Sequence, residues 1–171
     1  MKVQKKNKIF LMSAVFVLMT SSNIYAHCEI PCGIYDDAMR IKMIDEHIRT
    51  IEKSMKQIHE LQKADVIDYN QLVRWIMNKE EHAEQLSHIV TQYFMTQRLK
   101  PVDNSDGQSH RSYIVQLTSL HHLMVYSMKC KQTTDLANVA KLRENLARFK
   151  NAYFDQTEAV HMDHNDHSHQ H

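Results

Sequence analysis

Residues 36–61 read DDAMRIKMIDEHIRTIEKSMKQIHEL, and this stretch decides the fold. Apolar side chains recur in it at steps of three and four residues, with charged and polar residues between them. They are Ala38, Ile41, Ile44, Ile48, Ile51, Met55, Ile58 and Leu61. Such spacing predicts one apolar stripe on an amphipathic helix of about seven turns. Asp36 and Asp37 stand at its start, where carboxylates cap a helix and suit its dipole.

Three further helices are expected from the same pattern. A second covers 68–99 and ends at a Lys-Pro step, a third covers 109–131, and a fourth follows the Thr-Thr-Asp cluster at 133–135. The side chains expected to face the core are Leu72, Trp75, Ile76, Ala83, Leu86, Ile89, Val90, Tyr93, Tyr113, Leu117, Leu120, Met124, Met128, Leu136, Val139, Leu142, Leu146, Phe149 and Phe154. The chain has only two glycines and two prolines. The pattern therefore predicts an all-α fold, an antiparallel four-helix bundle over 36–156.

Residues 1–26 have the layout of a secretory signal peptide. Four lysines form a basic start, residues 9–19 are almost wholly apolar, and a short polar segment ends at Ala26. The apolar run is too short to span a bilayer comfortably. We expect cleavage after Ala26 and export to the periplasm or the extracellular space, with no membrane contact after processing. An uncleaved membrane anchor is the alternative.

The charge balance of the processed chain argues against nucleic acid as a partner. Removal of the four leader lysines leaves 17 basic and 20 acidic side chains, a net charge near −3. No basic face dominates, whereas nucleic-acid-binding proteins carry one.

Cleavage after Ala26 would leave HCEIPCGIY, residues 27–35, at the mature N-terminus. His27 would then offer a free α-amino group, whose ordinary pKa is near 8, and an imidazole. Cys28 adds a thiolate and a backbone amide, and Cys32 adds a second thiolate. These five groups are candidate metal ligands.

The residues between the donors allow the segment to curl back on itself. Pro31 fixes one backbone angle, and Gly33 permits a turn that bulkier residues resist. An amine, an amidate and two thiolates in one plane suit a d8 ion such as Ni(II), with the imidazole left for an axial position. A tetrahedral zinc site more often takes its ligands from two separated pairs.

The motif His-Cys-x-x-Pro-Cys-Gly-x-Tyr resembles the nickel hook of nickel-containing superoxide dismutases. Its six fixed positions are His27, Cys28, Pro31, Cys32, Gly33 and Tyr35. A looser similarity covers 79–90, so the resemblance extends over the mature domain to about Phe154. It implies a nickel hook at 27–35, a nickel ion as cofactor, superoxide as substrate and a homohexamer.

The same resemblance implies the roles of the hook residues. Superoxide would be converted into dioxygen and hydrogen peroxide while nickel cycles between Ni(II) and Ni(III). His27 would give the amine and a redox-dependent axial imidazole, Cys28 an amide nitrogen and a thiolate, and Cys32 the second thiolate. Tyr35 would sit beside the open face, where its hydroxyl could order water, limit anion access or supply protons.

The sequence departs from the family where the axial imidazole is held. A Glu on the first helix and an Arg on the second do this in the relatives that the motif resembles. Here His82 stands at the position of the Arg, and the Glu position falls near Lys42 or Met43. A metal-bound histidine needs an outer partner to fix its orientation. Asp45, Glu46 and His82 are the candidates, and we assign His82 to the catalytic site with Tyr35.

Two other functions remain open from the residues alone. In one, Cys28 and Cys32 form a local disulfide and the bundle is a helical interaction module. In the other, the protein binds nickel or copper and carries it without turnover. The His-rich tail at 157–171 favours a carrier slightly, since five histidines in its last eleven residues suit loose binding of divalent metal. We expect this tail to be disordered.

The remaining cysteine and histidines are given structural roles. Cys130 is expected to be a buried thiol near the end of the third helix. The other histidines of the helices are expected on helix surfaces or in satisfied core positions; they are His47, His59, His88, His110, His121 and His122.

Overall fold

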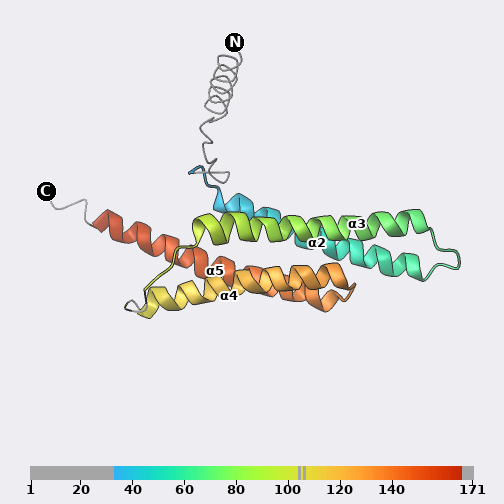
Figure 1. Cartoon of the computed structure of the whole chain (residues 1–171). Coiled ribbons are helices and arrows are strands. Elements are labelled where there is room, and N and C mark those ends of the chain that lie inside the picture. The colour runs from blue at the N-terminus through green and yellow to red at the C-terminus, as the bar shows by residue number, and fades with distance from the viewer. Residues whose placement is uncertain (1–32, 104, 106, 167–171) are drawn as a thin grey trace, which may run out of the picture. The chain divides into compact units, whose positions relative to one another are not determined.

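The computed structural model describes residues 33–103, 105 and 107–166, with side chains described as far as Phe154. The expected signal peptide and the metal-binding positions His27, Cys28 and Cys32 lie outside the described residues. The helices are α2 (Asp37–Gln62), α3 (Tyr69–His88), the π-helix η1 (Ile89–Arg98), α4 (Gly107–Gln132) and α5 (Leu136–Asp166) (Figure 1). The described ranges hold no strand, and the prediction of an all-α four-helix bundle is confirmed.

Aspartates cap three of the helices as their positions predict. The carboxylate of Asp36 accepts a hydrogen bond from the backbone N–H of Met39 at 2.9 Å, at the start of α2. Asp68 caps α3 in the same way, through the N–H of Gln71 at 3.1 Å. Asp135 accepts from the N–H two residues further on, at the start of α5. Each cap satisfies a backbone donor that the helix itself leaves free.

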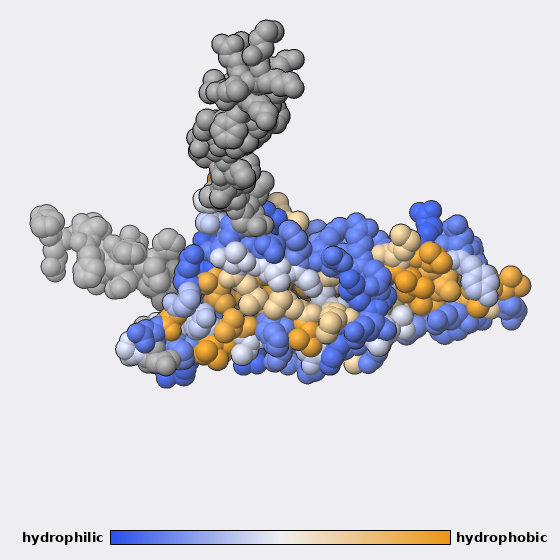
Figure 2. Space-filling view, in the orientation of Figure 1, coloured by the Kyte–Doolittle hydropathy of each residue, from blue (hydrophilic) through white to orange (hydrophobic). Residues whose placement is uncertain are grey.

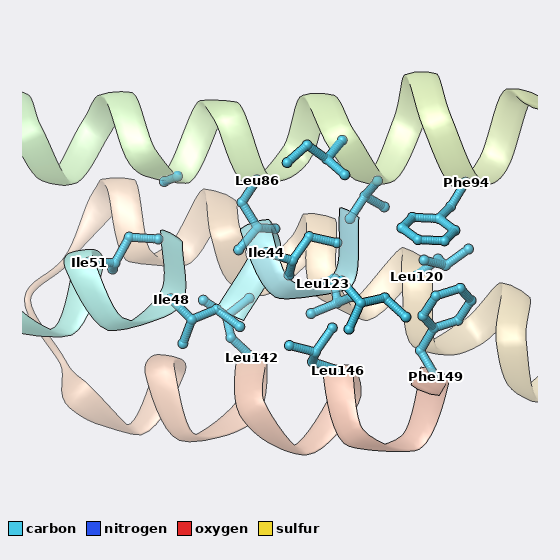
Figure 3. Packing of buried hydrophobic residues seen from close by; sticks show 14 of the residues in the cluster. Ile44, Ile48, Ile51, Leu86, Phe94, Leu120, Leu123, Leu142, Leu146 and Phe149 are labelled. Atoms are coloured by element: carbon cyan, nitrogen blue, oxygen red, sulfur yellow. The ribbon is translucent and has the colours of Figure 1, made fainter. Parts of the chain in front are cut away.

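The core lies where the apolar stripes of the four helices meet (Figure 3). Helix α2 packs against α3 and α5, and α4 packs against α5 and α3. The stripe of α2 is buried from Ile41 to Ile58 almost as predicted; at its ends, Ala38 is exposed and Leu61 is half-buried. The rings of Phe94 and Phe149 meet edge to face at 4.9 Å between centroids, in the layer nearest the start of α2.

The buried face of α4 differs from the predicted one. Met128 was expected in the core but is 51% exposed. On α3, Ile76 was also expected in the core and is 39% exposed. The residues of α4 that point inward are Gln116, Ser119, Leu120, Leu123, Ser127 and Cys130. Two of the polar ones donate to backbone carbonyls of neighbouring helices, Ser127 to Ala83 and Gln116 to Ala152. Small and hydrogen-bonded polar side chains therefore fill a face that apolar spacing alone misplaced.

The expected second helix changes its register in its last ten residues. Helix α3 ends at His88 and the π-helix η1 continues to Arg98. Hydrogen bonds there reach back five residues, as from the backbone N–H of Leu99 to the carbonyl of Phe94 at 2.7 Å. The side chain of Thr96 likewise donates to the carbonyl of Thr91 at 2.7 Å. π-Helical turns are rare and frequently occur at functional sites.

Helix α5 continues beyond the expected end of the bundle. Its backbone is helical to Asp166, so the first part of the tail that we expected to be disordered is an extension of the helix. Residues such as Glu158 and Ala159 favour helix, and adding turns to an existing helix requires no new nucleation. The last five residues of the chain lie outside the described ranges. No helix of the described ranges is both long and apolar enough to cross a membrane.

Apolar side chains are exposed near the turn between α2 and α3. They are Val66, Tyr69, Val73 and Met77, all more than half exposed. Figure 2 shows hydrophobic surface at this end of the helix pair. Contiguous exposed apolar surface on a folded protein marks a region of interaction.

Candidate metal centre

Gly33 is the first described residue of the expected hook, and its conformation is one that glycine favours. Its φ is +81°, in the left-handed region. A Cβ built at this position would meet no atom within 4 Å, so the backbone conformation and not the space restricts this position. The chain therefore turns two residues before Tyr35, as the motif predicts.

Tyr35 is held by its ring. The guanidinium carbon of Arg98 lies 4.4 Å from the ring centroid, within cation–π distance. The ring of Tyr93 meets it edge to face, with 5.9 Å between centroids. Tyr35 is 39% exposed, so these two contacts from η1 hold a side chain that otherwise faces solvent.

Asp37 joins three elements at the start of α2. Its carboxylate accepts from the hydroxyl of Tyr93 at 2.7 Å and from the hydroxyl of Tyr153 at 2.8 Å. Arg98 donates to both of its oxygens, from Nε at 2.8 Å and from Nη2 at 2.7 Å. We call Asp37, Tyr93, Arg98 and Tyr153 the Asp37 cluster. It links α2, η1 and α5 beside Tyr35.

The cluster keeps Asp37 ionised and both of its tyrosines protonated. Burial alone would raise the pKa of Asp37, but hydrogen bonds from Arg98, Tyr93 and Tyr153 outweigh it and hold the pKa below its ordinary value. Burial and the hydrogen bond to this carboxylate raise the pKa of Tyr153 to about 12. The pKa of Tyr93 is raised for the same reasons. At neutral pH the cluster thus holds one carboxylate, one guanidinium and two phenols.

Sequence reasoning missed this cluster. Asp37 was expected only as a helix-capping residue and Tyr93 only as a core residue, and no role was given to Arg98 or Tyr153. Tyr93 and Arg98 are five residues apart, a spacing that places two side chains on different faces of an α-helix. The π-helical register of η1 brings both to Asp37.

His82 forms a pair with His47 of α2. Their Nδ1 atoms are 2.8 Å apart, so one nitrogen donates and the other accepts. His47 is buried, and burial together with the charge of His82 lowers its pKa. Among the described residues, Nε2 of His82 has no hydrogen-bond partner. The sequence indicated His82 as an outer-shell residue, but it did not indicate His47 as its partner.

Asp45, another candidate for holding an axial imidazole, already has a partner. Asp45 forms an exposed ion pair with Arg49 at 2.7 Å on the same helix. At the position near which the family's Glu falls, the sulfur of Met43 accepts a long contact of 3.8 Å from Arg40. Within the described ranges, no three His, Cys, Asp or Glu side chains gather closely enough to hold a metal ion.

Cys130 is buried, as the sequence predicts. Its side chain is 0% exposed, and burial raises the pKa of its thiol to about 11. It is therefore a neutral thiol at physiological pH, unlike the thiolate that a metal requires. The buried ammonium of Lys79 donates to the carbonyl oxygen of Cys130 at 2.7 Å and closes the end of α4.

Comparison with known proteins identifies the family. The family model for nickel-containing superoxide dismutase matches residues 22–157, which include the hook motif, the Asp37 cluster and the histidine pair. The search of curated proteins gave no match, and the search of solved structures gave none either. A match over most of the chain shows the family. The chain therefore belongs to the nickel-containing superoxide dismutases, oxidoreductases that use a nickel ion and act on superoxide.

Proposed function

We propose that the mature N-terminus of this enzyme is its nickel site, with His27, Cys28 and Cys32 as the ligands. The donor set carries this proposal. Two thiolates, a backbone amidate and an amine suit a square-planar Ni(II) ion, and their negative charge stabilises the higher oxidation state. Nickel bound in this way supplies one-electron exchange with superoxide between Ni(II) and Ni(III).

Cleavage after Ala26 is a requirement of this proposal. The α-amino group of His27 exists only in the processed chain, so the signal peptide and the metal site depend on each other. We propose export to the periplasm or the extracellular space for this reason. Superoxide dismutation needs no other substrate than superoxide and protons, and two protons are consumed for each hydrogen peroxide formed.

Tyr35 is proposed to act beside the metal. It follows the ligand Cys32 by three residues, and the turn at Gly33 separates it from the ligand segment. Its phenol can order water and donate a proton at its oxygen. The ring is fixed by Arg98 and Tyr93, so the hydroxyl has a defined place relative to the start of α2.

His82 is proposed as the outer partner that holds the imidazole of His27. His47 engages Nδ1 of His82, which leaves Nε2 for a second hydrogen bond. The contact would fix the orientation of His82, and its Nε2 would accept or donate according to whether its Nδ1 donates to or accepts from His47. A pair of histidines would thus perform the task of the Glu and Arg of related enzymes.

A homohexamer is proposed from the family resemblance. The exposed apolar side chains near the α2–α3 turn support an oligomer, because a second copy would remove them from water. Their area alone does not define the number of subunits.

Metal analysis of the processed protein tests the proposed site. We expect about one nickel per chain by elemental analysis, and an electron paramagnetic resonance signal from the oxidised protein. Nickel bound without superoxide turnover would support a carrier. A Cys28–Cys32 disulfide without bound nickel would support the interaction module.

A further inference from the structure

Tyr35 lies outside the helices, and the ring contacts that hold it come from one short segment. It precedes α2 and is 39% exposed. Among the described residues, the two side chains that contact its ring, those of Tyr93 and Arg98, both belong to η1. The position of Tyr35 therefore depends on how firmly these two residues of η1 are themselves fixed.

Arg98 is fixed by a fork that only a guanidinium provides. Its Nε and Nη2 donate hydrogen bonds to the two carboxylate oxygens of Asp37, at 2.8 and 2.7 Å. The guanidinium carbon lies over the ring of Tyr35. The bidentate pair sets the plane of the guanidinium, and the plane sets where an aromatic ring can stack. A lysine ammonium has one charged atom and no plane, so it could keep the charge but not this geometry.

Asp37 is in turn held from two other directions. Tyr93 and Tyr153 donate to its two oxygens, one from η1 and one from α5. Tyr93 thus touches Tyr35 with its ring edge and Asp37 with its hydroxyl. The carboxylate sits in the first turn of α2, two residues after Tyr35, so the cluster fixes the chain at that point.

The π-helical register makes this arrangement. Residues five apart lie about 140° from each other around an α-helix. In η1 the backbone hydrogen bonds join residues five apart, so two such residues lie on nearly the same face of the helix. Tyr93 and Arg98 therefore both reach Asp37. An α-helical continuation of α3 would direct one of the two away.

We infer that Asp37 and Arg98 are positioning residues that hold the ring of Tyr35, and with it the phenol, in place at the start of α2. The functional consequence rests on the role proposed above for Tyr35, whereas the positioning itself does not. Neither residue touches the reacting atoms in this account; both act through Tyr35.

The test uses the processed, nickel-loaded enzyme and its Arg98→Lys and Asp37→Asn variants. Both substitutions keep the size of the side chain and some hydrogen bonding, so they preserve the fold better than alanine. Arg49→Met is the matched control, because it removes an arginine whose ion pair on α2 is exposed. The first readout is the nuclear Overhauser effect between the ring protons of Tyr35 and Tyr93 in tyrosine-labelled protein. Nickel content and turnover are measured on the same samples.

We expect wild type and Arg49→Met to show the ring–ring effect and both positioning variants to lose it. Nickel content should stay at the wild-type level in all four proteins. Turnover should fall about tenfold in the two variants, the lower end of the cost of losing an outer-shell residue. In a Tyr35→Phe background, Arg98→Lys should cost no further turnover, because residues that act through one another are not additive.

An intact ring–ring effect in both variants would overturn the positioning role, even if their melting temperatures fell. A lost effect with unchanged turnover would uphold the positioning and overturn the role of Tyr35 in catalysis. Wild-type protein without nickel would overturn the proposed metal site, while the ring–ring effect would still decide the positioning.

Discussion

Nδ1 of His47 lies 2.8 Å from Nδ1 of His82, and this contact joins α2 to α3. One of the two nitrogens must carry a proton and the other must not, because two N–H groups cannot face each other at this distance. The contact is therefore compatible with a proton on one of the two Nδ1 atoms and not with a proton on both. Burial and the neighbouring histidine accordingly lower the pKa of His47.

The first prediction concerns the pH dependence of stability. Because the folded-state pKa of His47 is lowered from 6.5, the unfolded chain binds the proton more readily. Stability from this group is full above the unfolded pKa and is lost as the pH falls toward the folded value. The free energy of unfolding should therefore decrease from about pH 8 to about pH 5.5. Urea titrations should show a smaller decrease for His47→Gln and an unchanged one for the exposed His121→Gln.

The second prediction concerns turnover and His82. His82→Ala should lower turnover about 10–100-fold, the usual cost of an outer-shell loss, while nickel stays bound by the equatorial donors. His82→Arg should restore much of the activity lost in His82→Ala, since a guanidinium can donate hydrogen bonds at this position. His88→Ala, an exposed histidine near the end of the same helix, is the control. Unchanged turnover of His82→Ala would return the search to Asp45 and Glu46.

The third prediction separates the two cysteines proposed as ligands from the buried Cys130. Cys28→Ser and Cys32→Ser should each lose all turnover, because a hydroxyl is a harder donor than a thiolate and does not stabilise Ni(III). Cys130→Ala should keep both nickel and turnover, since that thiol is buried and protonated. The measurements are metal content and superoxide consumption. Full nickel in both serine variants would show that neither thiolate is needed to hold the metal and would contradict the proposed ligand set.

The fourth prediction tests which face of α4 is buried. Leu123→Ala should lower the free energy of unfolding by about 2–5 kcal/mol, because Leu123 is 0% exposed. Met128→Ala on the same helix should cost less than about 1 kcal/mol, since Met128 is 51% exposed. Chemical denaturation of the two variants gives the comparison. A larger loss for Met128→Ala than for Leu123→Ala would mean that the face predicted from apolar spacing is the buried one.

The spacing of apolar residues predicted the helices and the buried face of α2, but not the buried face of α4 or the register of η1. Between Ile41 and Ile58 six of the eight buried positions of α2 are apolar, so their spacing alone identified a helix and its buried face, although it did not reveal the buried His47 and Ser54. Helix α4 turns Ser119 and Ser127 inward, and a search for apolar side chains does not detect such positions. The π-helical register of η1 likewise cannot be detected from apolar residues that recur at steps of three and four residues.

In the candidate site, too, the sequence predicted some residues and missed others. The ligand motif at 27–35 is contiguous, so it stands out in the sequence, and it also indicated Tyr35. The residues around it come together only in the folded chain. Tyr153 reaches Asp37 from 116 positions away, and His82 meets His47 from 35 positions away. Contacts between residues this far apart in the sequence cannot be predicted from local spacing.

The nickel content of a chain that begins with one added residue before His27 tests the central claim most directly. The added residue converts the α-amino group of His27 into an amide and leaves every side chain in place. The account predicts that the processed wild type binds about one nickel per chain and turns over superoxide. The extended chain should keep its helical circular dichroism spectrum but lose nickel and turnover. An extended chain with wild-type nickel content and wild-type turnover would contradict the account.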